Sequence, residues 1–237
     1  IYDLAAKRGN TINDLTAVVT GLLLALNLST NVAVWQCVIG AAFSIVLVKC
    51  VFGGIGRNFA NPAITARIVL MVSFPTAMTT FHNALDDMSS ATPLAGATVT
   101  GKQLFFGMHG GCIGEVSAFL LIVGGIYLIL RRVINPVIPV AFIGTVAVLT
   151  LVTGGNVGTQ VLSGGLMLGA IFMATDYTTS PTTILGKLIF GIGCGALTFV
   201  IRNYASLPEG VSYSILIMNI LVPHINRFTL SKPFGFI

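Results

Sequence analysis

The sequence predicts an all-α membrane protein, a polytopic bundle of transmembrane helices. Hydrophobic residues make up 55% of the chain and charged residues only 8%. A soluble domain carries about 25% charged residues, so most of this surface is expected to face lipid. In hydrocarbon, backbone polar groups must be satisfied within their own segment, which makes helices the expected structure. The lipid bilayer is therefore the first predicted partner.

Eight apolar segments can be placed along the chain, and together they predict a single integral membrane domain. A first helical block covers residues 1–80, a polar loop covers 81–114, and a second helical block covers 115–237. Most segments approach the roughly 20 residues that span a bilayer, but the first and sixth are short and rich in small residues. The predicted segments are 15–29, 34–51, 61–80, 115–131, 137–153, 163–175, 184–202 and 210–226.

The positive charges predict how the segments are oriented. Lys and Arg residues gather at every second connection, and the other side receives only Lys102 and Arg202, with Arg67 just inside the third segment. By the positive-inside rule, both ends of this chain are expected in the cytoplasm and residues 81–114 outside it. The net charge of +5 then belongs to cytoplasmic loops. Because no run of Lys and Arg is longer than two residues, nucleic acid is not an expected partner.

A weak internal repeat relates the two short segments. Residues 20–25 (TGLLLA) resemble residues 164–169 (GGLMLG), and each run is followed by a longer helix and a polar turn. Since the charges give the first and sixth segments opposite directions, the repeat is expected to be inverted, with short half-helices at matching positions. Such repeats place a site near the membrane midplane. Chance similarity among Leu- and Gly-rich helices is the alternative.

The polar loop contains a candidate attachment site. Two carboxylates and several hydroxyls gather in residues 86–95 (DDMSSATPLA) of an otherwise apolar chain. Thr92 offers a hydroxyl beside the small Ala91, and Asp86 can help to position a group attached there. An ordinary Ser/Thr-rich loop with Pro93 ending a turn explains the same residues.

A second candidate lies in residues 53–63 (GGIGRNFANPA). Clustered glycines let the backbone approach a ligand, and the amides of Asn58 and Asn61 can donate to anions or carbonyl oxygens. The other interpretation is a tight cytoplasmic turn, with Pro62 at the first position of the third segment.

Asp176, directly after Thr175, closes the short sixth segment and is the candidate for an ion path. A carboxylate inside a membrane is costly and marks a functional site by default. If the segment reaches the surface, Asp176 is a solvated turn residue instead. Glu115, at the outer start of the fourth segment, is interpreted as complementing the positive N-terminus of that helix.

The cysteines and histidines predict no metal site. The four cysteines lack CxxC or CxxH spacing, and His82 and His109 flank the loop without the spacing of metal ligands. Three cysteines are interpreted as apolar packing residues. Cys112, at the end of the loop, is the candidate for a reactive thiol.

The loop motif resembles a known flavin-attachment motif. Ser89, Ser90, Ala91 and Thr92 resemble the site of the Rnf and sodium-pumping quinone reductase families, which usually reads Asp-x-x-Ser-Gly-Ala-Thr. Asp86 takes the acidic position here, and Ser90 stands where glycine is usual. In these families the threonine hydroxyl carries FMN through a phosphodiester.

The resemblance extends over nearly the whole chain. Members of the RnfD family usually begin with further transmembrane helices, so a segment before residue 1 is expected. The runs that carry the resemblance are residues 14–27, 114–118, 162–181, 186–191 and 208–219.

This resemblance implies an activity, cofactors and partners. Rnf couples electron transfer between ferredoxin and NAD to the movement of Na⁺ or H⁺, so the chain is expected to belong to a redox-driven translocase in the cytoplasmic membrane of a prokaryote. It would carry FMN on Thr92, with riboflavin as a further candidate cofactor. The implied partners are the other Rnf proteins: the flavin protein RnfG, the iron–sulfur membrane proteins RnfA and RnfE, and RnfB and RnfC. The alternatives are the related NqrB protein of the quinone reductase, a cofactor-free solute channel or transporter, and a purely structural membrane protein.

Overall fold

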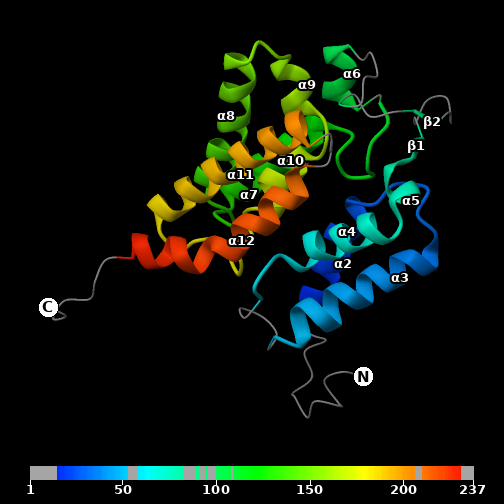
Figure 1. Ribbon diagram of the computed structural model, residues 1–237, viewed down its shortest axis with the longest axis horizontal. Helices are drawn as coiled ribbons and strands as arrows, with labels where there is room; N and C mark the ends of the chain where they lie inside the picture. The colour runs from blue at the N-terminus through cyan, green and yellow to red at the C-terminus, as the bar shows by residue number, and fades with distance from the viewer. Residues whose placement is uncertain are drawn as a thin grey trace, which may run out of the picture.

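The structure is a computed structural model that describes residues 15–52, 58–82, 89–90, 94, 100–107, 109–205 and 210–230. Its regular structure is helical apart from one pair of two-residue strands (Figure 1). The elements are α2 (Thr16–Leu26), α3 (Val34–Ala42), η2 (Phe43–Cys50), α4 (Pro62–Ser73), α5 (Pro75–Thr79), β1 (Phe81–His82), β2 (Ser89–Ser90), α6 (Gly101–Phe106), α7 (Ala118–Leu130), α8 (Val137–Val152), α9 (Val157–Leu162), α10 (Leu166–Leu168), η4 (Gly169–Met173), α11 (Ile184–Tyr204) and α12 (Gly210–Thr229).

All eight predicted apolar segments form helices, which confirms the predicted all-α fold class. Within the described ranges, α11 is the one helix both long and apolar enough to cross a membrane by length and composition. Shorter apolar helices accompany it, including α2, α7 and α8. Many of their apolar side chains face outward; Val34 is 80% exposed and Leu130 is 76% exposed. Exposed apolar surface of this kind suits contact with lipid or with neighbouring subunits.

The third predicted segment is two helices rather than one. α4 ends at Ser73 and α5 begins at Pro75, with Phe74 between them at φ −133° and ψ 58°. The residue before a proline is pushed out of the α region by the proline ring. The prediction of one continuous helix over residues 61–80 is therefore wrong, and the sequence signal for the break is Pro75.

Two of the helices continue directly into π-helical turns. η2 extends α3, and η4 extends α10. π-helical turns are rare and are frequent at functional sites. Lys49 lies in η2, and Asp176 follows η4 by three residues, so the two π-helical turns help to position these two charged side chains.

Two sets of three helices run in opposite directions. In Figure 1, α3 runs from right to left and α11 from left to right, and α4 and α12 are likewise opposed. In the first set, the short helix α2 precedes α3 and α4 in the chain. In the second set, the short segment α10 with η4 precedes α11 and α12. This arrangement agrees with the inverted repeat predicted from residues 20–25 and 164–169.

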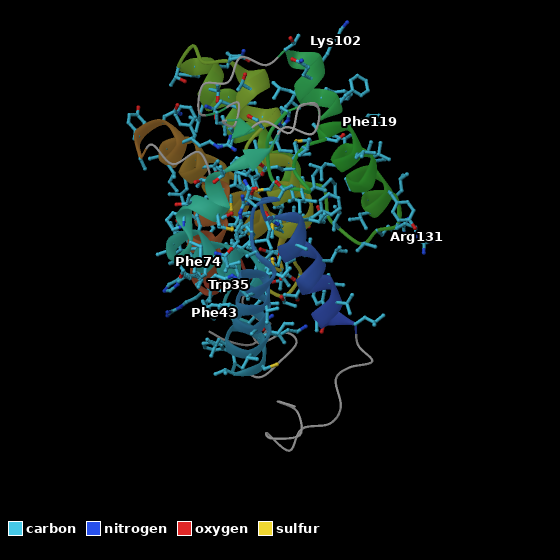
Figure 2. The ribbon with its side chains drawn as sticks, turned by 90° about the vertical axis from the view of Figure 1, so that its right-hand side faces the viewer. Trp35, Phe43, Phe74, Lys102, Phe119 and Arg131 are labelled. Carbon is cyan, nitrogen blue, oxygen red and sulfur yellow. The ribbon has the colours of Figure 1, made fainter. Side chains whose placement is uncertain are left out.

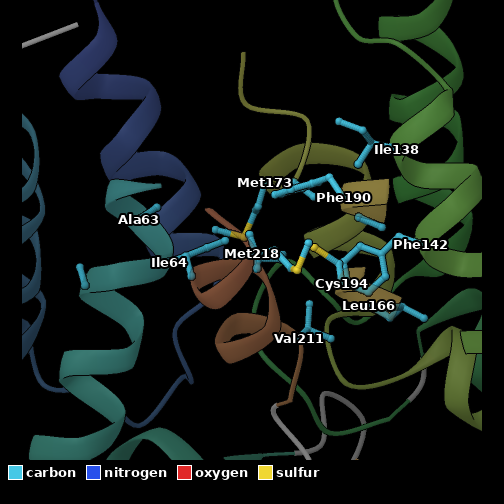
Figure 3. Packing of buried hydrophobic residues seen from close by; sticks show 14 of the residues in the cluster. Ala63, Ile64, Ile138, Phe142, Leu166, Met173, Phe190, Cys194, Val211 and Met218 are labelled. Carbon is cyan, nitrogen blue, oxygen red and sulfur yellow. The ribbon is translucent and has the colours of Figure 1, made fainter. Parts of the chain in front are cut away.

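The two sets share one hydrophobic core (Figure 3). Met218 of α12 lies between Ile64 of α4 and Cys194 of α11 in this view. Met173 of η4 belongs to the same cluster. The second short segment is thus packed into the centre of the molecule rather than on its surface.

The predicted polar loop contains regular structure of its own. β1 pairs antiparallel with β2, so that Phe81 faces Ser90 across the ladder. α6 follows and packs on α7, where the Phe105 and Phe119 ring centroids are 5.8 Å apart. The strand pair and α6 were not predicted from the sequence, because neither forms an apolar run long enough to stand out.

Candidate functional site

A cavity of about 360 Å³ lies between the two sets of helices. Its wall is formed by α2, by Lys49 of η2, by the start of α4, by the end of α7 and by the residues that follow η4. Its volume falls within the range of roughly 300–1,000 Å³ that is usual for small-molecule sites. Most of the wall is apolar, as at Leu23 and Phe172, and a few polar groups interrupt it.

The cavity brings together two candidates that the sequence analysis treated separately. Asn58 and Asn61 come from the connection before α4, while Thr175 and Asp176 come from the end of the short sixth segment. All four line the same wall. The connection before α4 and the end of the short sixth segment thus meet at one cavity, although the sequence analysis did not connect them.

Asn61 is used by the fold. Its Oδ1 caps α4 by accepting from Ala63 N at 3.0 Å and from Ile64 N at 3.3 Å. Pro62 occupies the first turn of α4, as predicted. Nδ2 of Asn61 donates to Met173 O at 3.2 Å and so joins α4 to η4. The structural interpretation of Asn61 is therefore confirmed, and its amide holds the cavity wall in place.

Asn58 is the freer of the two asparagines. It is half-buried, and its Oδ1 is a buried atom that accepts no hydrogen bond from any residue the structure describes. An unsatisfied buried oxygen is costly, and here it belongs to a residue that lines the cavity. The amide of Asn58 is thus suited to receive a donor from a ligand.

Asp176 is held by its own turn. Its Oδ1 accepts from Thr178 N at 3.1 Å and from Thr178 Oγ1 at 2.9 Å, and its Oδ2 accepts from Thr179 Oγ1 at 3.3 Å. Thr175 Oγ1 donates back to Ile171 O at 2.6 Å. The carboxylate is half-buried and faces the cavity, so it combines the turn interpretation with a position where a cation can approach.

Lys49 is a site residue that the sequence analysis missed. It was interpreted as a cytoplasmic charge after the second segment, yet it is only 8% exposed and lines the cavity. Its ammonium group donates to Thr16 Oγ1 across the wall. The available signal was a lysine placed before Cys50 and Val51, inside an apolar run rather than after it.

A second cavity of about 260 Å³ adjoins the first. The two share Val133, Ile134, Thr175 and Tyr177 in their walls, and the second also reaches Lys187 at the start of α11. Their walls together extend from Lys187 at the start of α11 to α2 and the start of α4.

Glu115 lies two residues before the N-cap of α7, and its side chain is buried. α7 begins at Ala118, and Ser117 is its N-cap. Glu115 is only 4% exposed, and its Oε1 accepts from Cys112 N at 3.1 Å. Cys112, the candidate for a reactive thiol, is fully buried in this chain.

The described part of the loop reaches the end of the bundle that contains Arg202. Leu94 and Arg202 both lie so close to Gly164 that a Cβ there would clash. Arg202 donates to Gln160 O at 2.6 Å and to Gly164 O at 2.8 Å. The charge pattern had assigned Arg202 and the loop to the same side, and the structure brings them together.

Comparison with known proteins decides the family. A family model described as NQR2, RnfD, RnfE matches residues 2–235. This chain belongs to the NQR2, RnfD, RnfE family.

Three relatives in this family are named as the D component of a redox complex. The chain is 46% identical, over 97% of its length and 76% of the relative, to the D component of the Na(+)-translocating ferredoxin:NAD(+) oxidoreductase complex of Acetobacterium woodii. It is 42% identical, over 95% of its length and 76% of the relative, to the D component of the proton-translocating ferredoxin:NAD(+) oxidoreductase complex of Clostridium ljungdahlii. It is 36% identical, over 94% of its length and 76% of the relative, to the D component of the ion-translocating oxidoreductase complex of Stutzerimonas stutzeri. The predicted resemblance to RnfD is confirmed, and with it a membrane component of an electron-transport complex.

In this member of the NQR2, RnfD, RnfE family, the attachment motif falls mostly outside the described residues. Asp86, Ala91 and Thr92 lie there, and of Ser89 and Ser90 the structure describes the backbone as β2. Covalent FMN on Thr92 therefore stays a prediction.

Proposed function

We propose that this chain is the flavin-bearing membrane component of an ion-translocating ferredoxin:NAD oxidoreductase complex. The observation that carries the proposal is the 46% identity to the D component of the Acetobacterium woodii complex over 97% of the chain. In the proposed role the chain relays electrons between neighbouring proteins, with RnfA, RnfB, RnfC, RnfE and RnfG as its partners. It couples their transfer to the movement of Na⁺ or H⁺ across the cytoplasmic membrane.

FMN is proposed to be attached to Thr92. A phosphodiester needs a side-chain hydroxyl on a segment that a transferase can reach, and Thr92 has that hydroxyl. Leu94 follows within two residues, or about 7 Å of extended chain, and it lies beside Gly164 and Arg202. The Nη atoms of Arg202 already donate to oxygens of Gln160, Ser163 and Gly164, so what Arg202 adds at this end of the bundle is its positive charge.

The cavity is proposed to receive the second, non-covalent flavin, riboflavin. Its lining fits a planar ring system with one polar edge: the walls at Leu23 and Phe172 are apolar, and Asn58 Oδ1 offers an acceptor for a ring N–H. Lys49 and Thr16 supply hydrogen-bonding groups for ring carbonyls on the same wall. When bound, a flavin supplies one- and two-electron transfer; the residues of this chain bind it and exclude lipid.

Thr92→Ala tests the proposal. In the assembled complex, wild-type chain should show in-gel flavin fluorescence after denaturation and the mass of an FMN adduct, and Thr92→Ala should show neither. Thr92→Ser should retain part of the adduct, because serine has the same hydroxyl with different rotamer preferences. Electron transfer should fail in Thr92→Ala, since the relay would lack one carrier.

Ser89→Ala and Ser90→Gly are the matched controls. Both change the motif but leave the hydroxyl of Thr92, so both should keep the adduct, and Ser90→Gly restores the usual form of the motif. Wild-type chain without an adduct, or an adduct of FMN mass that persists in Thr92→Ala, would overturn the assignment.

A further inference from the structure

The second cavity, of about 260 Å³, contains polar side chains whose donors the rest of the described chain leaves unused. It lies at the start of α8 and the start of α11. Four of its lining side chains can donate hydrogen bonds, and none of the four donates to a residue that the structure describes. These side chains are Asn135, Ser180, Thr182 and Lys187. All four donors are therefore available to a ligand.

Ser180 is the buried member of this set, with only 8% of its surface exposed. Its backbone N donates to Asp176 O at 3.0 Å, but its hydroxyl has no partner among the described residues. Buried hydroxyls are normally hydrogen-bonded, because one without a partner has lost its water for no gain. The hydroxyl of Ser180 at the cavity wall therefore indicates an occupant that carries an acceptor.

Lys187 gives the cavity its charge. The side chain is half-buried, and its ammonium group forms neither a hydrogen bond nor an ion pair with any described residue. Of the described acidic side chains, none lines this cavity. Asp176 faces the first cavity instead, and its oxygens accept from Thr178 and Thr179. A lysine without a neighbouring carboxylate favours an anionic ligand, and lysine is a common ligand of phosphate.

The two helices beside the cavity add positive charge of their own. A Cβ on Gly191 would lie 3.0 Å from Ile138 O, and a Cβ on Gly195 would lie 2.8 Å from Phe142 O. These contacts advance along both chains together, so α8 and α11 run in the same direction and begin at the same end of the bundle. The N-terminus of a helix carries a partial positive charge and is suited to bind phosphate.

The surface next to the cavity is apolar and exposed. Val133 and Tyr177 line the cavity and are 68% and 77% exposed, and Ile184 at the start of α11 is 69% exposed. In a membrane protein such a surface suits acyl chains. The charge pattern assigned Lys187 to the cytoplasmic side, where basic pockets between helices bind the headgroups of anionic lipids. These observations favour an occupant that comes from the bilayer.

We propose that the second cavity binds the phosphate of an anionic phospholipid. Lys187 neutralises the charge of the phosphate, and the hydroxyls of Ser180 and Thr182 donate to its oxygens. The acyl chains lie on the exposed apolar side chains, which include Val133 and Ile184. Inorganic phosphate offers the same oxygens without acyl chains, so the experiment has to distinguish the two sources.

Photo-cross-linking tests the proposal on the complete complex in detergent. The probe is a phosphatidylglycerol with a diazirine in one acyl chain, used below saturation, and label is measured by mass spectrometry on peptides that contain residues 133–138 or 180–188. Wild-type chain should be labelled there, and excess unlabelled phosphatidylglycerol should lower the label about tenfold. Dioleoylglycerol, which has acyl chains but no phosphate, and inorganic phosphate should leave the label unchanged at the same concentration.

Substitutions in the wall should change the label by different amounts. Lys187→Gln should lower it about tenfold, because a hydrogen bond between charged groups is lost. Ser180→Ala removes a neutral donor and should lower it about threefold. Lys187→Arg keeps the charge and should stay within about threefold of wild type. Arg131→Gln is the matched control, since Arg131 is exposed, precedes Val133 by two residues and does not line the cavity.

Three results would overturn the proposal. Equal labelling of wild type and Lys187→Gln would remove the phosphate contact, and an equal loss in Arg131→Gln would reduce it to general attraction to a basic surface. Competition by dioleoylglycerol or by inorganic phosphate as strong as that by phosphatidylglycerol would mean that acyl chains alone, or free phosphate, occupy the cavity. The flavins play no part in this measurement, so its failure would leave the proposed redox role untouched.

Discussion

At the scale of single residues, two asparagines three positions apart have different roles at one cavity. The amide of Asn61 is occupied by the cap of α4 and by Met173 O. Asn58 lines the same wall with a buried Oδ1 that no described donor reaches. Both residues were predicted as ligands from their position after a glycine cluster, because a sequence does not tell which amide is already used by the fold.

Substitution of the two asparagines should separate stability from ligand binding. Asn61→Ala removes an N-cap, which typically costs about 1 kcal/mol, and so should lower the unfolding temperature of the purified complex in detergent. Asn58→Ala should leave that temperature unchanged and reduce the amount of riboflavin that acid releases from the complex. Equal losses of riboflavin in both variants, at equal stability, would contradict this division of roles.

Asp176 allows a similar separation of charge from turn structure. Its carboxylate accepts from Thr178 and Thr179 and also faces the cavity. Asp176→Asn keeps an acceptor for the turn but removes the charge, so it should impair ion transport by the reconstituted complex more than flavin attachment. Thr178→Val removes a turn contact and keeps the charge, and it should transport normally. Normal transport by Asp176→Asn at normal assembly would reduce Asp176 to a turn residue.

At the scale of elements, long apolar runs predicted most of the helices. The predicted helices differ from the observed ones where a contact with another part of the chain, or a proline, determines the local structure. α9 was missed because its six residues form no long apolar run; Arg202 holds its end through Gln160 O and Ser163 O. The break between α4 and α5 follows from Pro75. The π-helical turn that carries Lys49 into the cavity wall has no sequence signal of its own.

The contact between α8 and α11 depends on two glycines of α11. A Cβ on Gly191 would lie 2.7 Å from Ala141 Cβ, and one on Gly195 would lie 2.6 Å from Thr145 Cβ. Small residues at such positions let helix backbones approach closely in membranes. The close packing of these two helices thus follows from the absence of side chains on one of them.

Added methyl groups should therefore destabilise this contact. Gly191→Ala or Gly195→Ala should cost about 1–3 kcal/mol by overpacking, visible as a lower unfolding temperature in detergent. Gly144→Ala is the control on the partner helix, since nothing lies within 4 Å of a Cβ there. It should be neutral or slightly stabilising, because alanine favours helix by about 1 kcal/mol over glycine. Equal effects of all three substitutions would mean that helix propensity, not packing, governs this interface.

At the scale of the whole molecule, the inverted repeat predicted a site near the middle of the bundle but not the residues that form it. That Asn61 and Thr175 line one cavity is known only from the structure. The repeat did not predict Lys49 in the cavity wall either, because this depends on which face of a helix turns inward. Distances between chain-distant side chains are set by tertiary packing, which local patterns do not contain.

The orientation predicted from the charges also concerns the whole molecule. Figure 2 shows Arg131 at one end of α7 and Lys102 beyond the other end, near Phe119. α7 has 13 residues, and a helix of that length rises about 20 Å. The two charges are therefore well separated along the bundle, as a position on opposite sides of a membrane requires.

Lys102 is expected outside the cell and Arg132 in the cytoplasm. Lys102→Cys should therefore react in intact cells with a thiol reagent that cannot cross the membrane, and Arg132→Cys should react only after the membrane is opened. The background for both should lack the native cysteines, of which Cys37 and Cys50 are partly exposed and Cys112 and Cys194 are buried. Lys102 lies in α6, before α7, and Arg132 lies just after the end of α7, so the labels report on the two ends of that helix. Labelling of Arg132→Cys but not of Lys102→Cys in intact cells would invert the orientation and move the Thr92 loop to the cytoplasm.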